Sequence, residues 1–434
     1  MMILNWLEER LGAGEAVGKI MHKPLRGGAR YCFSLGFVNL FLVVNQILTG
    51  IFLMMYYVPS PDHAYDSVKF IQNEAAMGNI VRGLHFWGAS AMVVFLFLHV
   101  LRVYLWGAYK KPRELMWLTG ATLFFLVFGF AFTGYLLPWD QKSYWATVVG
   151  TNVAGTAPVA GPIMLRVLRG GAEITALTLT RFFAIHTMVL PWTLAAVAGA
   201  HMTILQFVDH TPPWDPDRAK VTAPFYPDQV FKDMVVALAV FTGLMLLANL
   251  APAQLEAVAD PSDKSYIPRP EWYFYFLFQL LHYFEGRMEV VGTMVLPNLF
   301  IVVVMLLPFI DRSPERNPAK RPVAMAAIGM VLVGYVALTG IAAFEGRPVA
   351  PTKAATEGRK LYGQLGCGSC HAINGVGGKV GPPLDHISAR RDRQWLMMHF
   401  KDPQRMSPGS VMPKYDYLSQ QQLDSLTDYM QGMK

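Results

Sequence analysis

The sequence predicts an all-α protein: a bundle of seven transmembrane helices followed by a small all-α domain. Of its 434 residues, 53% are hydrophobic and only 15% are charged, which is far from the composition of soluble domains. A helix needs about 20 apolar residues to cross the roughly 30 Å hydrocarbon layer of a membrane. Seven runs are long enough: residues 36–58, 84–106, 115–137, 182–207, 231–250, 291–310 and 322–344.

The basic residues indicate how the bundle crosses the membrane. They concentrate in the N-terminal arm and in three alternate loops: Arg10, Lys19, Lys23, Arg26, Arg30, Arg102, Lys110, Lys111, Arg113, Arg218, Lys220, Arg312, Arg316, Lys320 and Arg321. This positive-inside pattern predicts a cytoplasmic N-terminus and an extracytoplasmic segment after about residue 345. Topology therefore accounts for the net charge of +7, and we expect lipid contacts and no nucleic-acid partner. We expect a bacterial inner-membrane protein without a removable signal peptide.

A lone thiol precedes the first span. Cys32 lies in the stretch "RYCFSLGF", whereas the other two cysteines belong to one motif near the C-terminus. Most free cysteines are small buried residues, and the chemistry of the thiol alone favours that explanation here.

The second and fourth spans each carry two histidines. His85 and His99 are fourteen residues apart, and His186 and His201 are fifteen apart. Ionisable residues inside a bilayer are costly and usually functional. At 100° per residue, the two histidines of each helix lie within about 60° of one another around the axis, so they share one face. They are roughly 21 and 22 Å apart along the axis. We expect two b-type haems, held by His85 with His186 at the outer site and His99 with His201 at the inner site. Hydrogen bonding between helices is the alternative.

Glycines and arginines support the haem interpretation. Pairs of glycines with the same fourteen-residue spacing occur in the first and third spans: Gly36 with Gly50 and Gly120 with Gly134. Missing side chains at these depths would let flat macrocycles lie against the backbone, although helix packing also uses glycine. Arg82 and Arg102 each lie three residues from a histidine, so they are candidates to pair with haem propionates or to extend to the interface.

The C-terminal segment carries "CGSCH". Cys367 and Cys370 can bond the two vinyl groups of one haem while His371 ligates its iron, as in c-type cytochromes. A redox or zinc C-x-x-C motif is the alternative. Met412 is the predicted sixth ligand. The other methionines considered are Met406, which competes for that role, and Met397 and Met398, which we expect to pack a helix.

These motifs resemble cytochrome b of the Rieske/cytochrome b complexes, specifically the b6f branch, fused to a cytochrome c. The resemblance is carried by "RGLHFWGASAMVVFLFLHV", "FTGYLLPWDQKSYWA", "PEWYFYFLFQLL" and "NPAKRPVA". It implies four parts: a di-haem four-helix domain at 1–211, a three-helix domain at 212–345, a linker at 346–356 and a cytochrome c domain at 357–434. A homodimer is also implied.

The same resemblance assigns the tetrapeptide "PEWY" to quinol oxidation. Its members are Pro270, Glu271, Trp272 and Tyr273. A carboxylate at the outer membrane edge can accept a proton from a quinol hydroxyl, so Glu271 is the expected base, with Tyr135 beside the same pocket. An isolated PEWY would otherwise indicate aromatic residues at the membrane interface.

In the b6f branch, a cysteine just before the first span bonds an extra haem through one thioether. Cys32 stands at that place, so the resemblance implies a covalent haem there. One departure is Gln206, which occupies a position where the branch has a basic residue near that haem.

The predicted function is quinol oxidation coupled to proton translocation. One electron would pass through the two b haems to a cytoplasmic quinone site and the other through a separate Rieske iron–sulfur subunit and the c haem to a downstream cytochrome c or other acceptor. The Rieske centre must be elsewhere because all three cysteines are assigned. The alternatives are a di-haem membrane anchor that conducts electrons between a dehydrogenase and the quinone pool, and a non-catalytic haem scaffold.

Overall fold

The computed structural model describes residues 6, 9–10, 12, 14, 18–19, 21–261, 266, 268–284, 286–344, 353–373, 376–385 and 387–432. The chain forms two compact units, Met1–Ala342 and Ala343–Lys434, and each is considered by itself. Most of the predicted linker at 346–356 lies outside the described residues.

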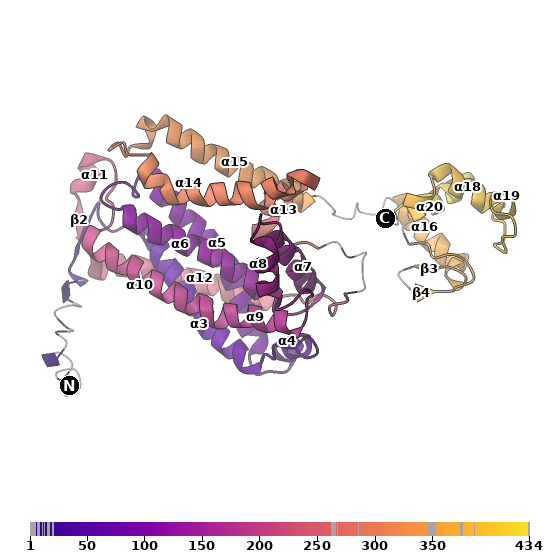
Figure 1. The fold of residues 1–434 in the computed structure, drawn as a ribbon, viewed down its shortest axis with the longest axis horizontal. Coiled ribbons are helices and arrows are strands. Elements are labelled where there is room, and N and C mark those ends of the chain that lie inside the picture. The colour runs from indigo at the N-terminus through magenta and orange to yellow at the C-terminus, as the bar shows by residue number, and fades with distance from the viewer. Residues whose placement is uncertain are drawn as a thin grey trace. The chain divides into compact units, whose positions relative to one another are not determined.

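The first unit contains the predicted membrane bundle (Figure 1). Within the described residues, seven helices are long and apolar enough to span a membrane, which confirms the predicted number. Their bounds are Tyr31–Tyr56, Gly78–Leu105, Glu114–Tyr135, Ala176–Val208, Phe225–Leu250, Gly286–Ile310 and Pro322–Phe344. The second, fourth and fifth begin six residues earlier than predicted, because the helices continue beyond the apolar runs.

Each span is built from one or more elements, of which Figure 1 labels the α-helices. In chain order they are η1 (Tyr31–Phe33) with α3 (Ser34–Tyr56); α5 (Gly78–Leu105); α6 (Glu114–Tyr135); α9 (Ala176–Ala184), η2 (Ile185–Val189) and α10 (Leu190–Val208); η3 (Phe225–Gln229) and α12 (Val230–Leu250); η5 (Gly286–Met288), η6 (Val291–Val295) and α14 (Leu296–Ile310); and α15 (Pro322–Phe344). Prolines set several boundaries: α6 ends shortly before Pro138, and α15 begins at Pro322, where a missing N–H costs nothing.

Shorter elements connect the spans. They are α4 (Ala64–Asn73), α7 (Gln141–Gly155), α8 (Gly161–Arg169), α11 (Pro216–Lys220), η4 (Trp272–Phe274), α13 (Tyr275–His282) and η7 (Pro318–Lys320). Strand β1 (Pro24–Arg26) pairs antiparallel with β2 (Thr222–Pro224), with Leu25 opposite Ala223. This pairing ties the N-terminal arm to the segment before the fifth span.

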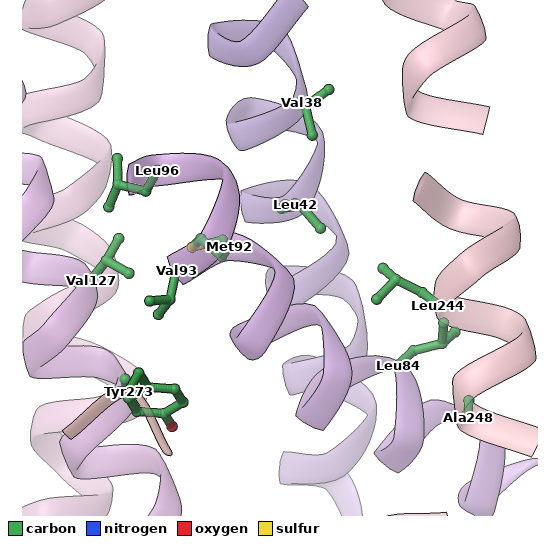
Figure 2. Packing of buried hydrophobic residues seen from close by; sticks show 11 residues of the cluster. Val38, Leu42, Leu84, Met92, Val93, Leu96, Val127, Leu244, Ala248 and Tyr273 are labelled. Carbon is green, nitrogen blue, oxygen red and sulfur yellow. The ribbon is translucent and has the colours of Figure 1, made fainter. Parts of the chain in front are cut away.

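The core of the bundle lies between α3, α5, α6 and α12. Helix α3 packs on α5, α10 packs on α6, and α12 packs against both α3 and α5. Figure 2 shows the buried side chains at this junction, which include Val38, Leu42, Met92, Val93, Leu96, Val127, Leu244 and Tyr273. The helices are close enough that a Cβ on Gly83 would lie 2.7 Å from the Cβ of Ala248, so a larger residue would push α12 away.

The second unit is small and mostly helical. Its elements are α16 (Lys353–Gln364), η8 (Cys367–Ser369), β3 (Ala372–Ile373), β4 (Val376–Gly377), α17 (Ile387–Arg390), α18 (Arg393–Lys401), α19 (Pro403–Met406) and α20 (Gln420–Gln431). Leu396, Phe400 and Leu423 belong to its core, where α16 and α18 pack against α20. A two-residue hairpin, β3 with β4, is a small departure from the predicted all-α domain.

Candidate functional site: a membrane electron-transfer centre

The structure brings the four membrane histidines together in two pairs at different depths. The rings of His85 on α5 and His186 on η2 have centroids 6.4 Å apart. His99 and His201 also lie close enough to interact electrostatically. These are the same pairs that topology predicts, one near each side of the bundle.

Each predicted glycine faces one of these histidines from the neighbouring helix. A Cβ on Gly50 would lie 3.3 Å from Cε1 of His85, and one on Gly120 would lie 3.2 Å from Cε1 of His201. Gly36 faces His99 and Gly134 faces His186 in the same manner. The glycines therefore make room for the imidazoles, and the expected room for a macrocycle stays a prediction.

Three threonines that the sequence analysis missed orient the imidazoles. The hydroxyl oxygens of Thr49, Thr119 and Thr133 lie 2.9, 2.9 and 3.0 Å from Nδ1 of His85, His201 and His186. Each threonine immediately precedes one of the predicted glycines, and this Thr–Gly dipeptide was the available signal.

The direction of these hydrogen bonds follows from the backbone. The hydroxyl of Thr49 lies 2.6 Å from the carbonyl of Asn45, and that of Thr133 lies 2.8 Å from the carbonyl of Gly129. Because each hydroxyl donates its proton to a carbonyl, its oxygen accepts the N–H of the imidazole Nδ1. The proton is then held on Nδ1, and Nε2 keeps the lone pair that a metal ion needs.

A π-helical turn sets the register between His186 and His201, the two histidines of the fourth span. In η2, the N–H of Leu190 donates to the carbonyl of Ile185, five residues earlier. Pro191 follows, and proline lacks an N–H and disrupts the regular α-helical pattern. The turn absorbs one extra residue, so the fifteen-residue step from His186 to His201 presents nearly the same face as fourteen residues of α-helix. The straight helix assumed from sequence predicted a larger offset.

The predicted PEWY segment lies at the end of the bundle near α7. Nζ of Lys142 lies 2.5 Å from Oε1 of Glu271, and both side chains are largely buried. The indole N–H of Trp272 lies 3.3 Å from the hydroxyl of Ser90. Burial raises the pKa of Tyr273 well above its ordinary value, and the neighbouring carboxylate of Glu271 raises it further. Sequence reasoning missed Lys142, which is 129 residues before Glu271 in the chain.

Tyr135 and Pro270 complete the predicted outer site. The ring of Tyr135 packs 6.1 Å from that of Phe274, and its hydroxyl is close enough to feel the charge of Glu271. Pro270 precedes Glu271, which leads into η4 with an extended backbone. The segment thus places a carboxylate and two phenol groups beside one another.

Arg82 has protein partners in the structure. Its guanidinium donates to Oε1 of Gln72 at 2.7 Å and to the carbonyl of Ala253 at 2.6 Å. Arg82 therefore has a structural role, tying α4 to the segment after α12, and its propionate role stays a prediction.

In the C-terminal unit, Cys367, Cys370 and His371 lie around η8. Nδ1 of His371 donates to the carbonyl of Pro382 at 2.8 Å, which leaves Nε2 for a metal. Burial raises the pKa of the Cys367 thiol. The predicted ligand Met412 packs against the core of this unit, whereas Met398 is 43% exposed.

Two buried polar atoms near this motif have no hydrogen-bond partner within the described protein: the hydroxyl of Tyr362 and Nδ1 of His399. Orphaned polar groups beside a C-x-x-C-H motif fit a bound group with polar edges. In the bundle, the paired imidazoles fit two b-type haems because their Nε2 atoms can ligate iron.

Comparison with known proteins supports this assignment. Family models match in three places: Cytochrome b/b6/petB at residues 20–208, Cytochrome b(C-terminal)/b6/petD at 258–356 and Cytochrome c at 355–434. The cytochrome b subunit of the cytochrome bc complex from Chlorobaculum thiosulfatiphilum is 34% identical over 340 residues, covering 77% of this chain and 79% of that protein. The chain belongs to the cytochrome b family.

Other relatives match parts of this cytochrome b or its fold. The menaquinol:cytochrome c reductase cytochrome b subunit of Bacillus subtilis is 50% identical over 213 residues, covering 47% of this chain and 95% of that protein. A solved structure titled "Hyperthermophilic respiratory Complex III" has a TM-score of 0.69 and 26% identity, covering 80% of this chain and 92% of that one. The predicted family is confirmed, and with it b-type and c-type haems as cofactors and a multi-subunit complex as the context.

Cys32 of this cytochrome b lies beside an arginine. Arg102 interacts with the thiol, and its guanidinium carbon lies 4.8 Å from the ring centroid of Phe33 and 4.3 Å from that of Trp106. Its Nε is buried without a hydrogen-bond partner in the described protein. Burial lowers the pKa of the nearby His210. A free thiol, a cation and an orphaned N–H are thus collected near the start of the first span.

The N-terminal arm adds a positive charge beside Gln206. Nζ of Lys23 donates to the main-chain oxygen of Gln206 at 3.0 Å and pairs with Asp209 at 2.6 Å. The charge of Lys23 is therefore paired with Asp209 next to Gln206. Only the folding of the arm against the fourth span brings it there.

A buried carboxylate also lies at this end of the bundle. Asp233, in the first turn of α12, is only 4% exposed. The amide of Gln229 donates to it at 2.8 Å and lies 3.3 Å from the hydroxyl of Ser34. The signal in the sequence was an acidic residue inside the apolar run "VFKDMVV".

Proposed function

We propose that this cytochrome b oxidises quinol at the outer site and reduces quinone at the cytoplasmic site, coupled to proton translocation. The observation that carries the proposal is a largely buried carboxylate, Glu271, held by a lysine at the end of a bundle with four paired imidazoles, three of them oriented by threonines. A membrane anchor that only conducts electrons has no need of such a carboxylate. Relatives named menaquinol:cytochrome c reductase cytochrome b subunit support this class of reaction.

The four histidines would hold two b-type haems, His85 with His186 outside and His99 with His201 inside. Bound there, the haems supply a one-electron path across the membrane. Thr49, Thr119 and Thr133 keep the proton on Nδ1, so that Nε2 stays available as a ligand.

At the outer site, the side chains bind quinol and move its proton. When Glu271 is a charged carboxylate, it accepts a proton from the quinol hydroxyl. Tyr273 stays protonated, the hydroxyl groups of Tyr135 and Tyr273 offer hydrogen bonds, and Pro270 and Trp272 shape the entrance to η4. At the other end of the bundle, the buried carboxylate of Asp233 would supply a proton to quinone.

The C-terminal unit would carry the second electron outward. Cys367 and Cys370 attach a c-type haem, with His371 and Met412 as its iron ligands. A separate Rieske iron–sulfur subunit delivers the electron, and a cytochrome c or similar protein accepts it. We place the complex in the bacterial inner membrane as a homodimer, with the N-terminus cytoplasmic and the C-terminal domain outside.

Cys32 would attach a further haem through a single thioether. Arg102 and Lys23 supply positive charge for its propionates, and Lys23 takes the place of the basic residue replaced by Gln206.

The test uses the purified complex with the short naphthoquinol menadiol. With the cytoplasmic site blocked by an antimycin-type inhibitor, adding an oxidant for the c haem should make the b haems more reduced. Each quinol oxidised at the outer site then gives one electron to the path through the c haem and one to the b haems. A stigmatellin-type inhibitor should abolish the effect. Oxidation of the b haems under the same conditions would contradict the proposal and favour a simple electron conduit.

A further inference from the structure

We propose that Lys142 is a positioning residue for Glu271, holding it as a carboxylate between turnovers and releasing it once it has taken a proton. The inference rests on the proposed function of Glu271. Nζ of Lys142 lies 2.5 Å from Oε1 of Glu271, where the side chains are 27% and 12% exposed. The lysine therefore stands between a largely buried carboxylate and water.

The backbone of Lys142 is firmly held. Asp140 caps α7 by accepting the N–H of Ser143 at 2.9 Å and also accepts the N–H of Glu256 at 3.1 Å. The N–H of Gln141 donates to the carbonyl of Ala257 at 2.9 Å. With its Cα anchored on both sides, the mobility of Lys142 lies in its flexible four-carbon stem.

Among the described residues, Lys142 is the cation that pairs with Glu271. The carboxylate faces Lys142 from α7, Tyr135 from the end of α6 and Tyr273 from η4. Burial raises the pKa of Tyr273 further from neutrality, so this phenol stays uncharged at any working pH. A largely buried carboxylate without a cation would tend to hold a proton, and one that already holds a proton cannot act as a base.

The ion pair also provides a release step. A quinol that becomes quinone loses two electrons, which leave by the carriers named above, and two protons. One proton passes to the carboxylate of Glu271, which becomes neutral, and the other passes to water at the outer face. The attraction to Lys142 then falls from that of an ion pair to that of a hydrogen bond, so the partly exposed lysine can turn to water and the carboxyl group can follow and lose its proton. The pair reforms when Glu271 is again charged.

The test compares Lys142→Met and Lys142→Arg in the whole complex with menadiol as the quinol. Each pH profile of the quinol oxidation rate is measured after the haem bands are checked. In Lys142→Met, the acid side of the profile should move up by about 1–3 pH units, the usual influence of a nearby opposite charge on a carboxyl group. Lys142→Arg should keep the wild-type profile. Lys69→Met, which removes an exposed lysine from α4, is the matched control and should change nothing.

Combination with Glu271→Gln separates the two proposals. In that background, Lys142→Met should cause no further shift, because the group that it positions is gone. A wild-type profile in Lys142→Met, with Glu271→Gln still slow, would overturn the role of Lys142 and leave the proposed function standing. A full rate in Glu271→Gln would instead overturn the role of Glu271 itself. If Lys142→Met does not assemble, Lys142→Gln provides the same comparison.

Discussion

The hydrogen bond from His186 to Thr133 can be removed almost without changing shape, by Thr133→Val. The hydroxyl oxygen lies 3.0 Å from Nδ1 of the ring, and its own proton is directed to the carbonyl of Gly129 at 2.8 Å. Valine keeps the volume but leaves the imidazole N–H without an acceptor. The substitution therefore tests whether the threonine orients a haem ligand.

The size of the effect follows from one lost hydrogen bond. Such a bond contributes about 1 kcal/mol, and loss of a group that orients a metal ligand typically weakens metal binding by about 10- to 100-fold. An imidazole whose N–H is no longer accepted is a weaker donor to ferric iron. If the whole 1 kcal/mol falls on the oxidised state, the midpoint potential of the outer b haem should rise by roughly 40 mV, since about 59 mV corresponds to a factor of ten for one electron.

The assay is a redox titration of the b-haem absorption bands in the purified complex, together with the haem content per chain. Thr122→Val is the matched control: Thr122 lies on the same helix and also hydrogen-bonds a carbonyl four residues earlier, that of Leu118 at 2.9 Å. The control should leave both potentials unchanged. An unshifted outer haem of normal content in Thr133→Val would refute the proposed role of the threonine.

Three further predictions test the site. Glu271→Gln should slow quinol oxidation by about 10²-fold with all haems retained, measured as menadiol oxidation, and full activity would exclude Glu271 as the base. His85→Ala should remove the outer b haem from the absorption spectrum, whereas loss of the c-haem band instead would contradict the assignment. A chain that ends near residue 350 should keep one haem through denaturing electrophoresis, and its Cys32→Ala version should keep none. A truncated chain whose mass equals that of bare polypeptide would mean that Cys32 carries no thioether.

The membrane bundle was predictable because its signals are local. Spans such as Gly78–Leu105 follow from runs of apolar residues that must bury their backbone in lipid, and the structure confirms their number among the described residues. Their ends were less predictable, since polar residues continue the same helices beyond the apolar runs. The histidines and "CGSCH" were recognisable for a similar reason, because haem chemistry requires those residue types at fixed spacings.

Several features of the candidate site depended on helix packing. The Thr–Gly dipeptides are visible in the sequence, but only the packing of α3 on α5 and of α6 on α10 shows that their hydroxyls meet histidines. The π-helical turn at Ile185–Val189 lies just before Pro191, which disrupts the regular hydrogen-bond pattern of an α-helix. The spacing of the histidines alone does not reveal whether the helix stays regular or forms such a turn.

The sequence by itself determined the fold class, the family and the residue types that can hold haems, because composition and spacing along one helix or one loop are enough to specify them. Only the tertiary structure joined Lys142 to Glu271 across 129 positions and brought Lys23 to Gln206 across 183. A charge on a loop has many possible partners until the chain is folded. Which partner it pairs with depends on which helix ends pack together and on how much water they exclude. The local sequence pattern determines neither.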